Sequence, residues 1–393
     1  MADRQSSSNA TDALLLPRGR AWLRRRLLTW FVRHARLLPW RSSRDPYAIW
    51  VSEVMLQQTQ VASVIPFFER FLASFPNVAA LARADLQQVL RHWEGLGYYR
   101  RARDLHRTAQ ILHAEHSGIF PHTPEVLRTM PGLGPYTVGA ILSQAFDLRL
   151  PILEANSIRV LCRYLGVRED PKKGLVRRSL WKAAATLLPV KQVGQFNQSL
   201  MELGALVCTP TLPDCPRCPL ARHCRARLGD CQEEIPQRAR KTAPTIIREV
   251  CLVLRRGAEV LLAQRPATGR WAGLWEFPHT ALAREESPSQ CGARLLAELG
   301  LTAELGDEIV TLKHAVTRFR ITLICLDACY RRGRFRTEFY TQGQWLTPGE
   351  LTHFPVSSSQ RRLASVLCSK WMLHAKPDLH RCVASYGFGD VKA

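Results

Sequence analysis

Apolar side chains recur every three or four residues through roughly the first 230 positions, which is the spacing that gathers them on one face of an α-helix. Asp45-Pro46 supplies a helix cap followed by a first-turn proline. Helices are predicted at residues 18–36, 47–60, 84–94, 102–115, after Thr123-Pro124, and at 176–188. No alternating pattern typical of strands occurs before about residue 246, so this region is expected to be mostly α.

The pattern changes after a charged, proline-containing segment at 231–246. Strands are predicted at 247–254, 260–264, 308–315 and 319–328. Ser287-Pro288-Ser289-Gln290 forms a capping box that opens a helix ending at Gly300. The sequence therefore predicts a second, α/β domain. The expected organisation is a tail at 1–20, a helical domain at 21–230, a linker at 231–246, the α/β domain at 247–370 and a tail at 371–393.

The composition of the chain fits two domains and is strongly basic. The chain has 393 residues, 46% of them hydrophobic, which is enough for two cores. Lys and Arg number 55 against 33 Asp and Glu, a formal charge of +22 spread along the whole chain. A polyanion is the natural partner of such a surface. Charge alone is also compatible with a soluble basic protein that has no such partner.

Targeting signals are not evident in this sequence. It contains no run of eighteen apolar residues and no secretory signal at its start, so no membrane association is expected. The expected location is intracellular, in the cytoplasm or nucleoid if the source is bacterial. Twelve cysteines in a reducing compartment do not argue for disulfides.

Four of those cysteines, Cys208, Cys215, Cys218 and Cys224, are separated by six, two and five residues. One compact loop with a single Cys-x-x-Cys pair and two wider gaps favours a 4Fe-4S cluster, with zinc as the main alternative. Ordinary buried thiols are disfavoured, because three prolines make the segment a rigid loop without apolar periodicity.

A carboxylate lies in an apolar stripe of the helix predicted at 47–60. Glu53 shares one helix face with Trp50, Val54, Gln57 and Val61. A buried, unpaired carboxylate is energetically unfavourable, so Glu53 is expected to have either a chemical task or a charged partner. Arg70 and Arg163 are the candidates for that partner.

Two glycine turns interrupt the helices, one at 95–99 and one at 130–136. In the second turn, Gly132 and Gly134 allow close approach to the backbone N–H groups that begin the next helix. Such groups and the helix dipole bind phosphate oxygens. A turn that merely reverses the chain is the alternative. A dinucleotide site is excluded, because no strand precedes either turn.

Together these segments resemble a known family. The helix-hairpin-helix turn at 131–136, the sequence Leu153-Glu154-Ala155-Asn156 and the four-cysteine loop are similar to DNA glycosylases related to endonuclease III. The segments 52–61 and 95–103 narrow the resemblance to MutY-type adenine DNA glycosylases. The resemblance is strong over residues 25–230 and weaker over 246–370.

The resemblance implies roles for individual residues. Glu53 would be the acid that protonates adenine N7, and burial would raise its pKa. Tyr136 and Asn156 would orient the nucleophile. Bifunctional relatives have a lysine at the place of Tyr136, so a monofunctional enzyme that uses water is expected. Gln58 and Tyr98 would enter the base stack when adenine is flipped out. The alternative for Tyr136 and Asn156 is that each is a buried polar group with satisfied hydrogen bonds. For Gln58 and Tyr98 the alternative is core packing.

The second catalytic carboxylate departs from the family pattern. Family members usually have Asp-Gly-Asn where this chain has Glu154-Ala155-Asn156. Glu154 would stabilise the oxocarbenium ion on the sugar, but its extra methylene shifts the carboxylate, and a shift of about an ångström can lower a rate about a hundredfold. The alternative is that Glu154 only interacts with the dipole of the following helix.

The second domain is similar to Nudix-type domains through the stretch 271–278. Its helix at 291–299 has only Glu298 where a Nudix hydrolase needs several glutamates for magnesium, so pyrophosphate hydrolysis is not expected. The family recognises 8-oxoguanine through a Phe-Ser-His loop, and this chain has Val316-Thr317-Arg318 there. Thr317 retains a hydroxyl, whereas Arg318 introduces a permanent charge.

The resemblance thus implies a monofunctional glycosylase, expected to be a monomer, and the cysteine spacing favours a 4Fe-4S cluster. Its substrate would be double-stranded DNA with adenine opposite 8-oxoguanine or, less readily, guanine. Three alternatives stay open. They are a glycosylase for another mismatched base, a lesion-binding protein weakened in catalysis by Glu154, and a nucleotide pyrophosphatase built on the second domain.

Overall fold

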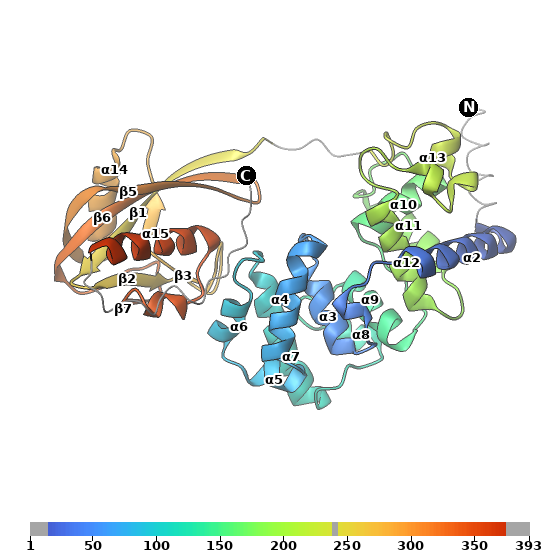
Figure 1. The fold of residues 1–393 in the computed structure, drawn as a ribbon, viewed down its shortest axis with the longest axis horizontal. Coiled ribbons are helices and arrows are strands. Elements are labelled where there is room, and N and C mark those ends of the chain that lie inside the picture. Colours follow the sequence, from blue (N-terminus) through green and yellow to red (C-terminus); the bar gives the residue numbers. More distant parts are fainter. Residues whose placement is uncertain (1–14, 238–242, 375–393) are drawn as a thin grey trace. The chain divides into compact units, whose positions relative to one another are not determined.

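The computed structural model describes residues 15–237 and 243–374. The chain divides into two compact units. The N-terminal unit contains residues 1–83 and 104–241, and the C-terminal unit contains residues 84–103 and 242–393. The first is helical and the second is a mixed sheet with helices, as the sequence predicts (Figure 1). No helix of the described segments has the length and apolar character needed to cross a membrane.

Short loops connect the helices of the N-terminal unit. They are α2 (Pro17–His34), α3 (Pro46–Met55), α4 (Val61–Ser74), α5 (Val78–Arg83), most of α7 (Arg100–His116), α8 (Pro124–Arg128), α9 (Pro135–Phe146), α10 (Ala155–Leu165), α11 (Gly174–Leu187), α12 (Val193–Leu206) and α13 (Arg225–Leu228), with 3-10 turns η1 (Pro39–Arg41), η2 (Cys215–Arg217) and η3 (Ala221–His223). Asp45 caps α3 as predicted, accepting hydrogen bonds from the Tyr47 and Ala48 N–H groups at 3.0 and 3.3 Å. Strands begin only at Thr245 among the described residues.

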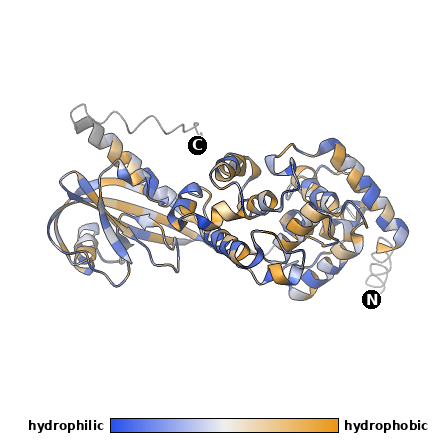
Figure 2. Ribbon diagram, turned by 90° about the horizontal axis from the view of Figure 1, so that it is seen from below, coloured by the Kyte–Doolittle hydropathy of each residue, from blue (hydrophilic) through white to orange (hydrophobic). Residues whose placement is uncertain are grey.

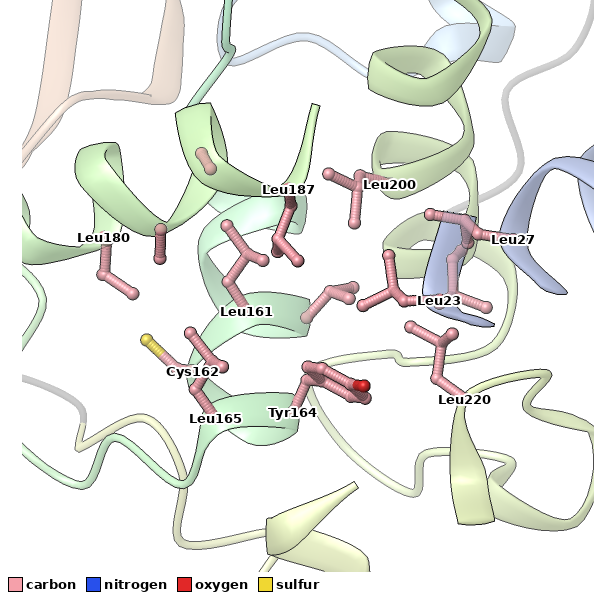
Figure 3. Close-up of a cluster of buried hydrophobic side chains, with 14 of the residues drawn as sticks. Leu23, Leu27, Leu161, Cys162, Tyr164, Leu165, Leu180, Leu187, Leu200 and Leu220 are labelled. Atoms are coloured by element: carbon pink, nitrogen blue, oxygen red, sulfur yellow. The ribbon is translucent and has the colours of Figure 1, made fainter. Parts of the chain in front are cut away.

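A hydrophobic core joins α2, α10, α11 and α12 in the N-terminal unit. Leu23 and Leu27 of α2 belong to one cluster with Leu161 of α10 and Leu200 of α12, and all four are buried (Figure 3). Leu220, from the four-cysteine loop, belongs to the same core. The cysteine loop is therefore anchored to the helical scaffold by apolar packing.

The boundaries expected for the tails and linker differ from the elements observed. Helix α2 begins at Pro17, inside the expected 1–20 tail, and α15 (Ser358–His374) continues past residue 370. In the expected linker, Cys231 and Ile235 are buried in the core of the N-terminal unit. Residues 1–14, 238–242 and 375–393 lie outside the described part of the chain.

Helix α12 approaches its neighbours too closely for side chains at two positions. A Cβ at Gly194 would lie 2.5 Å from the Ser143 carbonyl oxygen of α9. A Cβ at Gly204 would lie 2.6 Å from the Asn156 Cβ at the start of α10. Since real Cβ atoms do not approach other heavy atoms so closely, these glycines fix how near α9 and α10 lie to α12.

The C-terminal unit contains a seven-stranded sheet with the order β3-β2-β1-β6-β5, in which β4 also pairs with β1 and β7 with β2. The strands are β1 (Thr245–Arg256), β2 (Glu259–Gln264), β3 (Trp275–Glu276), β4 (His279–Ala281), β5 (Leu301–Val316), β6 (Phe319–Gly333) and β7 (Gln342–Leu346). The β1–β6 pair is parallel and the other pairs are antiparallel. The predicted strands at 308–315 and 319–328 form one long hairpin, β5–β6 (Figure 1).

Alternation along β1 gives the sheet two apolar faces. Cys251 and Val253 pack in one core with α15, whereas Val250 and Leu252 pack in another with α14 (Pro288–Glu298). In Figure 2 most helices carry both hydrophobic and hydrophilic residues, as expected for elements that cover a core on one side. The predicted capping box is confirmed: Ser287 Oγ accepts from the Gln290 N–H at 3.2 Å, and the Gln290 side chain accepts from the Ser287 N–H at 2.9 Å.

Residues 84–103, which include α6 (Leu86–His92), group with the C-terminal unit although they lie in the middle of the helical sequence. Arg361 of α15 pairs with Glu94 through two hydrogen bonds of 2.6 and 3.0 Å, and both side chains are largely buried. The Tyr99 hydroxyl donates to the Val356 carbonyl at 3.1 Å. Arg103 donates to the Ala272 carbonyl at 2.6 Å. Buried polar contacts of this kind explain the grouping.

The close approach of α12 generates a stability prediction. Gly204→Ala should destabilise the protein by about 1–3 kcal/mol, because the added methyl must displace the start of α10. Chemical denaturation followed by circular dichroism measures this change in the free energy of unfolding.

Gly174→Ala is the matched control, because its nearest neighbour would be 3.9 Å away in the first turn of α11. It should be neutral or stabilising, by up to about 1 kcal/mol. Equal effects of the two substitutions would refute the packing argument.

Candidate active site

Helix α3 places Glu53 in the interior of the N-terminal unit. The Glu53 side chain is buried, with 4% of the residue exposed, among apolar neighbours of the same helix. The apolar stripe predicted from the sequence therefore does bury the carboxylate. Neither Arg70 nor Arg163 is its partner: the Arg70 guanidinium lies over the Phe67 ring, and Arg163 donates to the Ile235 and Thr209 carbonyl oxygens.

Two neutral side chains satisfy Glu53 instead. The Tyr136 hydroxyl donates to Oε2 at 2.5 Å, and Gln144 Nε2 donates to Oε1 at 2.9 Å. Burial raises the pKa of Glu53, and these two hydrogen bonds only partly oppose the rise. Since no buried cation neutralises Glu53 among these partners, the carboxyl group is suited to hold a proton and release it to a bound molecule.

The glycine turn before α9 positions Tyr136 next to Glu53. Gly132 has φ +73°, a conformation that favours glycine, and it lies against Asp104 of α7. Gly134 begins α9 in an extended conformation, with open space where a Cβ would be. The turn is therefore open to an approaching ligand, while α9 directs Tyr136 and Gln144 inward to Glu53.

Glu154 caps the N-terminus of α10. Its two carboxylate oxygens accept from the backbone N–H groups of Asn156 and Ser157, each at 2.7 Å, and Ser157 Oγ accepts from the Glu154 N–H at 2.9 Å. Burial raises the pKa of Glu154, and these N–H donors act in the opposite direction. The charges of Glu154 and Glu53 also interact, which raises the pKa of Glu53 further. The two carboxyl groups therefore belong to one site.

Asn156 is held in place by a buried arginine. Arg159 Nη2 donates to Asn156 Oδ1 at 2.8 Å and to the Gly204 carbonyl at 2.7 Å. Arg159 Nε donates to the Cys208 carbonyl at 2.6 Å. One side chain thus connects the start of α10, the end of α12 and the first cysteine of the loop.

A cavity of about 520 Å³ opens beside these groups. The predicted residues Glu53, Gln58, Tyr136, Glu154 and Asn156 all line it. Gln58 is exposed at its edge and has a left-handed backbone with φ +59°. The volume suits one planar heterocycle together with its sugar.

Sequence reasoning missed an ion network on the same cavity. Glu202, only 1% exposed, accepts from Arg36 at 2.8 and 2.9 Å and from Arg41 Nη2 at 2.9 Å. Burial alone would raise the pKa of Glu202, but the hydrogen bonds from Arg36 and Arg41 lower it to about 2. The available signal was the one that identified Glu53: a carboxylate between apolar residues, here Met201 and Leu203.

Three other predicted residues belong to the C-terminal unit. Tyr98 is 43% exposed in the turn of Gly95 and Gly97, with φ +50°. Thr317 forms the tip of the β5–β6 hairpin with φ +51°, which is unusual for a β-branched residue. Arg318 is exposed, with its guanidinium 5.1 Å from the centre of the Phe319 ring.

The cysteine loop brings four thiols into mutual electrostatic range. Burial raises the pKa of Cys218 to about 12, and the charges of Cys208, Cys224 and Cys215 raise it as well. Arg163 Nη1 lies 3.4 Å from Cys208 Sγ, and Cys224 Sγ donates to the Arg163 carbonyl. The side chains at positions 15–237 and 243–369 include no group of three or more His, Cys, Asp or Glu that could hold a single metal ion. All four donors are sulfur, which suits iron in a cluster as well as zinc.

Chemically, the cavity offers a buried acid, a second carboxylate and fixed cationic donors around space for a nucleoside. A protonated Glu53 can donate to a leaving heterocycle, and an ionised Glu154 can stabilise a positive charge that develops beside it. The geometry suits cleavage of a bond between a base and a sugar.

Comparisons with known proteins identify related families for both parts of the chain. The family model of the HhH-GPD superfamily base excision DNA repair proteins matches residues 51–186, and the NUDIX domain model matches residues 249–365. The adenine DNA glycosylase of Rattus norvegicus is 36% identical over 405 residues, covering 87% of this chain and 77% of the rat protein. That of Homo sapiens is 34% identical over 86% of this chain and 73% of the human protein.

Bacterial relatives and solved structures are similar over parts of the chain. An adenine DNA glycosylase of Buchnera aphidicola is 38% identical over 64% of this chain and 72% of its own length. A solved thermostable thymine-DNA glycosylase is 27% identical with a TM-score of 0.49, covering 53% of this chain and 97% of its own. Since the rat relative is more than 30% identical and aligned over more than two thirds of its length, the chain belongs to the adenine DNA glycosylase family.

Proposed function

We propose that this protein is a base-excision repair enzyme that hydrolyses the N-glycosidic bond of adenine in DNA. The observation that carries the proposal is a buried Glu53 with a raised pKa beside a cavity of nucleoside size. Such an acid keeps its proton at a pH where an ordinary glutamate is ionised, as a general acid needs. Membership of the adenine DNA glycosylase family supports adenine as the base.

In the proposed reaction, Glu53 donates its proton to N7 of the extruded adenine. The bond between N9 and C1′ breaks, and its electron pair leaves with the base. The sugar then carries an oxocarbenium charge, to which water adds, and the proton that water loses restores the acid. Tyr136 and Asn156 orient this side of the site. With tyrosine at position 136 the enzyme is monofunctional and leaves an abasic site.

Glu154 is proposed to stabilise the sugar cation despite its departure from the family pattern. Both of its oxygens are fixed by N–H donors of α10, so the longer side chain folds back on the helix start. Donors of this kind favour the ionised form that the transition state needs. The same carboxylate can therefore cap α10 and stabilise the sugar cation, so the two roles expected for Glu154 do not exclude each other.

The network of Arg36, Arg41 and Glu202 is proposed to hold the flipped base. Adenine presents both hydrogen-bond donors and acceptors on its edge, and the network offers guanidinium donors and a carboxylate acceptor at the cavity wall. Because Glu202 fixes both arginines, their positions need little reorganisation when the base enters.

The partner is proposed to be double-stranded DNA with adenine opposite 8-oxoguanine, or less readily guanine, bound by a monomer inside the cell. Gly132 and Gly134 would contact phosphate, and Gln58 and Tyr98 would fill the stack. Thr317 and Arg318 would contact the lesion strand. The exposed positions of Gln58, Tyr98 and Thr317, each with a positive φ, support contact with a ligand.

A 4Fe-4S cluster is proposed to be held by Cys208, Cys215, Cys218 and Cys224. The spacing of the thiols and their electrostatic interaction support this cofactor. Its role is structural: when bound, it would fasten the loop whose Leu220 packs into the core. The arginines of this loop would contact phosphates.

Glu53→Gln should lower the rate of adenine release at least about 10²-fold, because glutamine cannot donate the proton. Single-turnover assays with alkali cleavage, on duplexes with adenine opposite 8-oxoguanine, measure this rate. In the wild type the rate should fall as pH rises through the raised pKa of Glu53, above the usual range of a glutamate. Strand cleavage confined to duplexes with uracil or thymine mismatches would reject adenine as the substrate.

Glu154→Ser separates charge from capping, since serine is also a good N-cap. The free energy of unfolding should change by less than about 1 kcal/mol, while adenine release falls about 10²–10³-fold. Glu154→Asp keeps both functions and should retain most of the rate. An active Glu154→Ser enzyme would leave Glu154 with a capping role alone.

The purified protein should contain iron and acid-labile sulfide in equal amounts and absorb visible light broadly. Cys218→Ser should lose both signals and lower the thermal melting midpoint. Cys162→Ser, at a buried cysteine outside the loop, is the control and should keep the iron. Zinc without iron in freshly purified wild type would contradict the proposed cofactor.

A further inference from the structure

A second cavity lies in the C-terminal unit and takes no part in the proposed reaction. Its volume is about 560 Å³, within the range of small-molecule sites. The residues that line it come from the ends of β1, β5, β6 and β7 and from the loop after β6. None of these lining residues, all within the described part of the chain, is acidic.

Three arginines give this cavity a positive charge. Arg256 extends over the Trp345 ring, with its guanidinium 4.5 Å from the ring centre, and pairs with Glu259. Arg334 and Arg336 are exposed, and the described residues give neither an ion pair. Two uncompensated guanidinium groups beside an aromatic wall attract an anion of more than one charge.

The aromatic side chains of the cavity are held rigidly. Phe335 lies against Gly343 of β7, where a Cβ would come within 2.7 Å of its ring. Tyr330 and Trp345 form an edge-to-face pair with ring centres 5.2 Å apart. All three rings are half-buried, so they combine a fixed position with an exposed surface. Such rings suit stacking of a heterocyclic base.

The loop after β6, which carries Arg334 and Arg336, is fixed to the turn between α14 and β5. The Arg336 N–H donates to the Leu299 carbonyl at 3.0 Å, and the Arg336 stem crosses Gly300, where a Cβ would lie 2.6 Å from it. The walls of the cavity are therefore preformed, because the aromatic rings and the backbone of this loop are held by neighbouring elements.

This cavity and Thr317, the residue proposed to contact the lesion strand, lie at opposite ends of the β5–β6 hairpin. Thr317 is at one end of the hairpin, and Gly333, which lines the cavity, ends β6 at the other. Fifteen residues of strand span roughly 45 Å. A ligand in the cavity is therefore not the base that meets Thr317.

We propose that this cavity binds an unpaired nucleotide, with its base against Phe335 and its phosphates on Arg334 and Arg336. A base within a duplex is stacked on both faces and cannot enter. The nucleotide is therefore either free or part of a single strand. The proposal concerns binding alone and does not depend on adenine release.

Isothermal titration of the full-length protein with dGTP, with inorganic tripolyphosphate and with oligothymidylate tests the assignment at low salt. The charge-reversed variant R334E/R336E should weaken nucleotide binding at least about tenfold. Arg284→Glu, at an exposed arginine elsewhere in the unit, is the control for charge reversal outside the cavity and should bind as the wild type does. The thermal melting midpoint reports folding of each variant.

Phe335→Ala separates a nucleotide from a simple anion. It should weaken binding of dGTP while binding of tripolyphosphate is retained. Loss of binding in R334E/R336E for dGTP identifies a free nucleotide, and loss for oligothymidylate alone identifies a single strand. The proposal is overturned if R334E/R336E binds both nucleotide probes like Arg284→Glu, or if Phe335→Ala leaves nucleotide binding unchanged.

Discussion

The packing of α10 against α12 is the constraint on which the site depends. Gly204 lets the two helices meet at the backbone, and Arg159 then fastens Asn156, the Gly204 carbonyl and the Cys208 carbonyl together. Glu154 begins the same helix, so its carboxylate is positioned by the contact that orders the cysteine loop. A disturbance at any of these points therefore reaches the carboxylate through a few rigid contacts.

The two buried glutamates of the cavity, Glu53 and Glu202, have pKa values shifted in opposite directions. Burial raises the pKa of Glu53, and its two neutral hydrogen-bond donors only partly oppose the rise, whereas hydrogen bonds from two guanidinium groups lower the pKa of Glu202, which stays ionised. The same residue type thus has a raised proton affinity in one wall and holds two cations in the other. The difference comes from partners on neighbouring elements, since both side chains are almost fully buried.

Helix caps and the spacing of apolar residues, which depend on neighbours in the sequence, predicted the class of each domain and several of its helices and strands. The caps at Asp45 and Ser287 are confirmed, because a cap depends on residues within four positions of itself. Helix α12 is harder to recognise, because it buries Asn197, Ser199 and Glu202 beside its apolar residues, which obscures the helical period. The hydrogen-bond partners of Glu53 could not be predicted for a different reason: Gln144 lies 91 positions away and its sequence surroundings do not indicate its target. The cavity itself follows from packing between helices far apart in sequence.

The grouping of residues 84–103 with the sheet has a consequence for the motion of the molecule. Glu94, clamped by Arg361, holds the turn of Tyr98 on the same compact body that carries the hairpin of Thr317. Both side chains therefore travel together whenever that body rotates or shifts. The separation of Tyr98 and Thr317 is therefore set by contacts inside this one unit, whatever position the unit takes.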